Sequence, residues 1–114
     1  MPESNPFPSL FTPLHIRGVE IRNRIVSTGH DTTMITDGLI NDRVIAYHQA
    51  RAAGGAGLIV AQVTGVHESA RYTNHVLMGT EDACIEGFKK LADTVHAEGA
   101  KLLVQLFHPG REMT

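Results

Sequence analysis

A single polar side chain interrupts the last apolar run of this sequence. The run extends from Leu102 to Phe107, is broken at Gln105, and stops at Pro109 and Gly110. This pattern is typical of a buried parallel strand that brings one polar group to a site at its C-terminal end. An amide offers a donor and an acceptor, which suits a ring edge where carbonyl and N–H groups alternate, such as the pyrimidine part of a flavin. The alternative is a core glutamine bonded to a neighbouring strand or buried water, and the run alone favours it.

A second expected strand also ends in small and polar residues. The strand over residues 23–28 continues into the segment Gly-His-Asp-Thr-Thr at 29–33. A change from apolar to polar residues at a strand end is typical of an active-site loop, and it is equally typical of an ordinary exposed loop. A third strand, expected over residues 58–63, carries a polar residue near its end as well.

Seven histidines raise the hypothesis of a metal site. His30, His67 and His108 each lie at or after the C-terminal end of an expected strand, where a barrel could bring them together for metal-dependent hydrolysis. The sequence has no His-x-His pair and no obviously matching carboxylate, so loop histidines are the favoured interpretation. The remaining histidines are expected in surface or hairpin positions: His15, His48, His75 and His96.

The single cysteine cannot form an internal disulfide, nor can it alone hold zinc or an iron–sulfur cluster. Cys84 has a helix-like spacing among apolar residues, which predicts a small core side chain. The two tyrosines, Tyr47 and Tyr72, are interpreted as structural or loop residues.

The elements that must position these side chains alternate between strands and helices. Short alternating segments around Gly18 predict a β-hairpin over residues 14–22. Asn41 or Asp42 can cap a first helix. Its expected shared face carries Ala46, Ala50 and Ala53, and it ends at Gly54 and Gly55. The glycine cluster at 54–57 precedes a strand, whereas a phosphate loop follows one, so it predicts a helix stop and a tight turn.

A polar loop is expected over residues 64–79, and a second helix follows it. Thr80 opens this helix and Gly99 ends it, and its expected face carries Ile85, Phe88, Ala92 and Val95. The order strand, helix, strand, helix, strand predicts a parallel α/β arrangement. A parallel sheet needs both faces covered, and an eight-fold β/α barrel needs roughly 250 residues. We therefore predict the N-terminal portion of a TIM (β/α)8 barrel, with about three β/α units after the hairpin, and residues 1–114 as one incomplete domain.

Composition limits the function classes. The sequence is 42% hydrophobic and 19% charged with a net charge of −2, which is typical of a soluble globular protein without a nucleic-acid footprint. The N-terminus lacks the features of a signal peptide, and no apolar run reaches membrane-spanning length. The sequence thus predicts a cytoplasmic protein that binds neither nucleic acid nor membrane.

Four segments, in order over nearly the whole chain, together resemble the old yellow enzyme family of FMN-dependent oxidoreductases. They are LFTPL at 10–14, NRIV at 23–26, GAGLI at 55–59 and QLFHPGR at 105–111. The resemblance implies a TIM barrel that binds FMN at the C-terminal ends of its strands. It also implies hydride transfer from NADH or NADPH through the flavin to an activated alkene or enoyl substrate, or oxidation of an N-methylated amine in one branch.

The resemblance assigns six residues to FMN binding. Gln105 matches the glutamine that hydrogen-bonds the flavin pyrimidine ring, which reverses the interpretation drawn from its run alone. The other five are Thr28, Gly29, His30 and Asp31, in the loop after the first strand, and Val63 at the end of the second strand. No catalytic residue is assigned, because the family's substrate-binding and proton-donating residues lie beyond the third strand.

Three of these six positions depart from much of the family, many of whose members have proline where this chain has Gly29 and an apolar residue where it has His30. His30 favours the branch resembling 2,4-dienoyl-CoA reductase, trimethylamine dehydrogenase and N-demethylases, whose longer members add a 4Fe-4S cluster and FAD beyond this segment. Asp31 stands where members often have threonine or cysteine, so covalent flavin attachment through a cysteine at this position is excluded. A carboxylate beside a flavin disfavours the anionic reduced ring, so Asp31 either turns away or lowers the flavin potential.

The partners implied are a small-molecule substrate and the remainder of the barrel or a partner chain, and a homo-oligomer is left open. The isolated segment is expected to be inactive, since three units leave open sheet edges. An inactive fragment, or a split-barrel half completed by another chain, is therefore the alternative to an oxidoreductase. A metal-dependent TIM-barrel hydrolase is less favoured.

Overall fold

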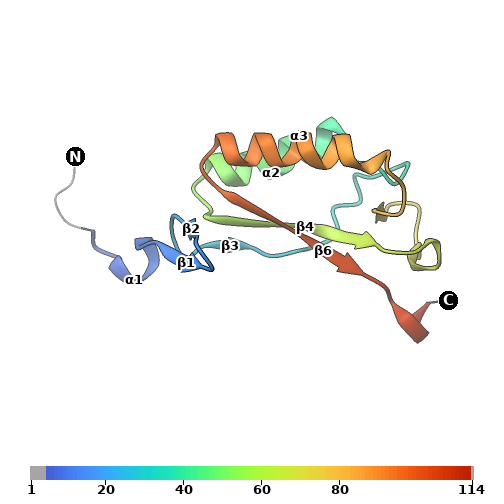
Figure 1. Cartoon of the computed structure of the whole chain (residues 1–114), viewed down its shortest axis with the longest axis horizontal. Coiled ribbons are helices and arrows are strands. Elements are labelled where there is room, and N and C mark those ends of the chain that lie inside the picture. The colour runs from blue at the N-terminus through green and yellow to red at the C-terminus, as the bar shows by residue number, and fades with distance from the viewer. Residues whose placement is uncertain (1–4, 114) are drawn as a thin grey trace.

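A parallel sheet with two helices on one face forms the body of the structure (Figure 1). The computed structural model describes residues 5–113. Strand β4 (Leu58–Gly65) is central, with β3 (Val26–Ser27) parallel to one edge and β6 (Lys101–Phe107) parallel to the other. The short β5 (Leu77–Met78) pairs with the C-terminal end of β4. This confirms the predicted parallel arrangement of strands and connecting helices.

A β-hairpin lies at the N-terminal end of the strands (Figure 1). It joins β1 (Leu14–Ile16) to β2 (Val19–Ile21), after the short helix α1 (Pro8–Phe11). Arg17 and Gly18 form the turn with φ of 47° and 84°, the left-handed values that a two-residue type I′ hairpin requires. The predicted hairpin around Gly18 is confirmed.

The side chain of Arg22 fastens this end of the molecule to both helices. Its guanidinium donates to the carbonyls of Ala52 at 2.6 Å, Ala56 at 2.9 Å and Glu98 at 2.7 Å. Carbonyls at a helix C-terminus lack hydrogen-bond partners within the helix, and the helix dipole makes this end negative. A cation there is therefore favoured both as a donor and as a charge. Gly99, at φ +89°, leaves room for the guanidinium, because a Cβ there would lie 2.6 Å from Nη1.

The first helix, α2 (Asp42–Ala53), begins as expected but turns a different face to the core. Asn41 is the N-cap and its Oδ1 accepts from the amide of Val44 at 3.0 Å. The buried residues are Val44, Ile45, His48 and Ala52, whereas the predicted face of Ala46, Ala50 and Ala53 is exposed. Alanine fits either environment, so the larger aliphatic side chains decide which face is buried. The surface position predicted for His48 is also wrong, because its side chain is fully buried.

The second helix, α3 (Cys84–Ala97), starts four residues later than predicted. Residues 80–83 form turns instead, with the amide of Cys84 donating to the carbonyl of Glu81 at 3.0 Å. Leu91 and Val95 are buried, while Ile85 is 61% exposed and does not belong to the inner face. Phe88 and Val95 of the predicted face do pack inward, and Gly87 lies so close to Ile40 that a Cβ there would be 2.8 Å from the Ile40 Cβ. Cys84 is half-buried, not a core side chain.

The main core lies between the sheet and the helices. It joins Ile59 and Ala61 of β4 to Leu91 and Val95 of α3, with Ile45, Ala52, Ala56 and Ala100 completing the cluster. The expected polar loop over residues 64–79 contains a 3-10 turn, η1 (Glu68–Ala70), and the buried strand β5. A second 3-10 turn, η2 (Gly110–Glu112), follows β6. None of the described helices is long and apolar enough to cross a bilayer.

Candidate functional site

Two strand residues and one residue of the loop after β3 meet at the C-terminal end of the sheet. Leu102 and Val104 pack against the core beneath the helices, so Gln105 points from the opposite face of β6. Val63 of β4 is its register partner. After β3, Gly29 lies so close that a Cβ there would be 2.5 Å from the Gln105 Oε1. The structure thus brings together three of the six predicted site residues, and a glycine is what makes this approach possible.

An irregularity in β4 creates this arrangement. The pairing of β4 with β6 shifts between Ala61 and Val63, which leaves Gln62 as the extra residue of a β-bulge. Gln62 is completely buried. The extra residue changes which side chains alternate toward each face, so that Val63 pairs with Gln105. Gln62 is therefore a site residue that the sequence interpretation missed, although it interrupts an apolar run just as Gln105 does.

The carboxylate of Asp31 joins a polar network around Gln62. The Nε2 of Gln62 donates to Asp31 Oδ1 at 3.2 Å, and the Oγ1 of Thr32 donates to Gln62 Oε1 at 2.6 Å. The hydroxyl of Tyr72 donates to Asp31 Oδ2 at 2.7 Å. This bond, with smaller contributions from burial and the carboxylate charge, raises the pKa of Tyr72 above its ordinary value. Asp31 therefore points at β4 and the loop after it, and Tyr72 makes a structural contact, one of the two roles predicted for it.

His30 is directed toward helix α2. Its Nδ1 lies 2.7 Å from the carbonyl of Thr28 and its Nε2 is hydrogen-bonded to the hydroxyl of Tyr47. Since a carbonyl only accepts, the proton lies on Nδ1 and Tyr47 donates to Nε2. The guanidinium of Arg51 lies 3.5 Å from the centre of the Tyr47 ring. The neighbouring His48 has its pKa lowered to about 4 by burial first, then by the charges of His30 and Arg51.

Two of the three histidines considered for a metal ion share one serine as a hydrogen-bond partner, and the third makes a separate contact. His67 Nδ1 and His108 Nε2 each lie 2.8 Å from the Oγ of Ser69, whereas His30 is bonded to Tyr47. Within residues 5–113, no group of three His, Cys, Asp or Glu side chains is placed to hold a metal ion. The geometry gives the hydrolase hypothesis no support.

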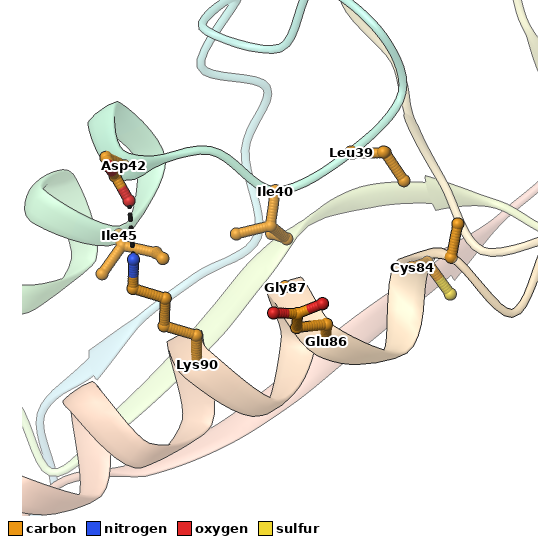
Figure 2. A pocket seen from close by; sticks show the side chains of 9 residues that line it. Leu39, Ile40, Asp42, Ile45, Cys84, Glu86, Gly87 and Lys90 are labelled. Atoms are coloured by element: carbon orange, nitrogen blue, oxygen red, sulfur yellow. Dashed lines mark hydrogen bonds and ion pairs between the residues drawn. The ribbon is translucent and has the colours of Figure 1, made fainter.

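A separate hollow lies on the outer side of the molecule, between α2 and α3 (Figure 2). It has a volume of about 250 Å³ and is lined by residues that include Leu39, Ile40 and Cys84. Across it, Lys90 Nζ and Asp42 Oδ1 form an ion pair at 2.9 Å. None of the six predicted site residues lines this hollow, so it is distinct from the end of the sheet where Gln105 lies.

The chain is similar to flavin oxidoreductases in sequence and structure. Residues 9–114 match the profile of the NADH:flavin oxidoreductase / NADH oxidase family. N,N-dimethylglycine/sarcosine dehydrogenase of Chromohalobacter salexigens is 36% identical over 109 residues, which cover 92% of this chain and 16% of that protein. NADH oxidase of Thermoanaerobacter brockii is 38% identical over 110 residues, which cover 95% of this chain and 17% of that protein. The structure of a 2-naphthoyl-CoA reductase complex superposes with a TM-score of 0.88 at 32% sequence identity. The match covers 95% of this chain and 17% of the reductase chain.

These relatives are much longer than the chain, which spans about 15% to 31% of the curated relatives it matches. The strands β3, β4 and β6 and the helices α2 and α3 correspond to the first part of their barrel. The predicted fold class, the N-terminal portion of a TIM barrel, is confirmed. The chain belongs to the NADH:flavin oxidoreductase / NADH oxidase family, which is the old yellow enzyme family that its four sequence segments resemble.

Proposed function

We propose that this chain forms the FMN-facing beginning of the barrel of an NAD(P)H-dependent oxidoreductase. Family membership supports a flavin and a nicotinamide donor. The observation that carries the assignment to FMN is the meeting of Gly29, Val63 and Gln105 at the C-terminal end of the sheet, where barrel enzymes bind their ligands. The exposed amide of Gln105 offers both hydrogen-bonding functions that a flavin pyrimidine edge requires.

Each predicted residue has a distinct task in this proposal. Gln105 orients the pyrimidine ring, and the missing side chain at Gly29 leaves space for the backbone of residues 28–31 to approach the ring system. Val63 provides an apolar contact at the ring edge. When bound, FMN supplies the hydride chemistry that the protein side chains cannot perform. The protein's part is to bind the ring and to hold donors near it.

The substrate proposal has two members. One is an activated alkene or enoyl compound, and the similar structure described as a 2-naphthoyl-CoA reductase complex supports it. The other is an N-methylated amine, and the similarity to N,N-dimethylglycine/sarcosine dehydrogenase supports it. A 4Fe-4S cluster or FAD, where present, would be bound outside this segment.

The test is FMN binding by the full-length protein that contains this chain. We expect purified protein to show a flavin absorbance spectrum and to release FMN on denaturation, since covalent attachment at Asp31 is excluded. Flavin-free protein with the mass of 114 residues would instead support the inactive-fragment hypothesis. Flavin-free protein that copurifies with a second chain would support the split-barrel hypothesis.

The role of Gln105 is tested by Gln105→Leu. Losing its hydrogen bonds is expected to weaken FMN affinity about tenfold or more, because each bond contributes roughly 1 kcal/mol and an unpaired ring edge adds to the loss. Titration of flavin-stripped protein with FMN measures the change. Gln49→Leu, the same substitution at an exposed position of α2, is the matched control. Equal affinities of both variants and the unmodified protein would contradict the assignment.

A further inference from the structure

We infer that Asp31 is a positioning residue, whose carboxylate fastens the middle of the loop after β4 to the loop after β3 through the hydroxyl of Tyr72. The inference rests on the proposed function only in placing these two loops beside the flavin. The contacts themselves are properties of this chain. They give Asp31 a task other than contacting FMN.

The network requires an acceptor at both carboxylate oxygens of Asp31. Thr32 donates to Gln62 Oε1 at 2.6 Å, which fixes the amide so that its Nε2 faces Asp31 Oδ1. Tyr72 donates to the other oxygen at 2.7 Å. An asparagine offers only one acceptor oxygen, and a threonine is shorter by one atom. The structure therefore explains why a carboxylate is suited to this position.

Tyr72 fixes the middle of the loop to Asp31, whereas Ser69 in the same loop is bonded to His108 after β6. At the start of the loop, the amide of Val66 donates to the carbonyl of Phe107 at 3.2 Å, and near its end the Nδ1 of His75 lies 2.8 Å from the carbonyl of Ile35. Between these anchors, Tyr72 reaches Asp31 with its hydroxyl and packs edge-on against the Phe107 ring, with centroids 5.5 Å apart.

The fastened tyrosine forms one wall of a hollow at the end of β6. Tyr72 is 41% exposed, and it lines a volume of about 440 Å³ with Phe107, Pro109 and Glu112. Releasing its hydroxyl would free both this wall and the loop that carries it. Asp31, in the loop after β3, thus determines the position of the Tyr72 side chain in the loop after β4.

The experiment is amide hydrogen exchange on the full-length protein, with and without FMN, for Asp31→Asn, Tyr72→Phe and the double variant. We expect each single substitution to accelerate exchange of residues 71–75 about tenfold, because a hydrogen bond to a charged group is lost. The double variant should exchange no faster than the faster single variant, since Tyr72→Phe removes the same bond that Asp31→Asn deprives of its charge. Tyr47→Phe, which removes a hydroxyl bonded to His30 instead, should leave these residues unchanged.

Two outcomes would overturn the inference. Unchanged or additive exchange rates would show that the bond does not hold the loop. A raised flavin midpoint potential in Asp31→Asn, with unaltered exchange in Tyr72→Phe, would show that the carboxylate acts on the flavin directly. Because exchange is also measured without flavin, a failure to bind FMN would refute the proposed function and leave this test intact.

Discussion

The two faces of the sheet differ in what their residues do. Toward the helices, Ile59 of β4 and Leu102 of β6 pack in the core with Leu91 of α3. On the opposite face, Leu103 is 55% exposed and Gln105 carries an accessible amide. Alternate residues of the same strands therefore serve stability on one face and, in the proposed function, ligand binding on the other. Substitutions on one face should leave the property of the other face nearly intact.

The largest expected effect is on the helix-facing side. Leu91→Ala should lower the free energy of unfolding by about 3 kcal/mol, because Leu91 is fully buried and its removal leaves a cavity. Urea denaturation of the full-length protein measures this, and FMN affinity of the folded variant should stay unchanged. Ile85→Ala, on the exposed side of the same helix, should cost less than about 1 kcal/mol. Comparable losses in both variants would contradict the described core.

Lowering the pH should reduce the free energy of unfolding through His48, which is buried on the helix-facing side of the sheet. The pKa of His48 is about 4 in the folded protein and 6.5 in its ordinary state. Between these pH values His48 therefore binds a proton in the unfolded chain but not in the folded chain. The contribution to stability is complete above pH 6.5 and is lost as the pH falls toward 4, amounting to about 3 kcal/mol at most. Unfolding between pH 7.5 and 4.5 measures it.

Substituting this histidine isolates its share of the acid sensitivity. His48→Phe should flatten the stability profile over this range, whereas His96→Phe, at an exposed position of α3, should not. A profile that His48→Phe leaves unchanged would show that other groups cause the acid sensitivity.

The smallest expected effect is on the opposite face, at Gly29. Gly29→Ala places a methyl group 2.5 Å from the present position of Gln105 Oε1, so the amide must move and FMN affinity should fall about tenfold. The unfolding free energy should change far less than in Leu91→Ala. In a Gln105→Ala background the same substitution should have little further effect on FMN affinity. Equal losses in both backgrounds would show that Gly29 acts independently of the amide.

Sequence patterns predicted the fold better than the site. Gly18 and its alternating neighbours predicted the hairpin, and the apolar runs predicted β4 and β6, because these signals are local. The buried faces of the helices were harder to predict, because alanines at helical spacing fit a solvent-exposed face as well as a buried one. Ile85 was assigned to the inner face because its spacing fits, but α3 begins only at Cys84 and its first turn leaves Ile85 exposed.

The site was only partly predictable for a physical reason. That Gln105 and Gly29 lie near each other follows from the C-terminal ends of parallel strands meeting at one edge. The bulge at Gln62 depends on pairing between β4 and β6, which no single segment encodes. The bond from Tyr72 to Asp31 joins residues 41 positions apart, so it depends on the final path of two loops.

Arg22 has a consequence for the order in which the protein is assembled during synthesis. Its guanidinium is translated early, but its partner carbonyl on Glu98 comes 76 residues later. At about 5 to 20 residues per second, the ribosome needs about 4 to 15 s to supply it. Until then the N-terminal hairpin cannot acquire its final attachment, however soon its two strands pair. The hairpin beside Arg22 is therefore synthesised well before it can be fixed in place.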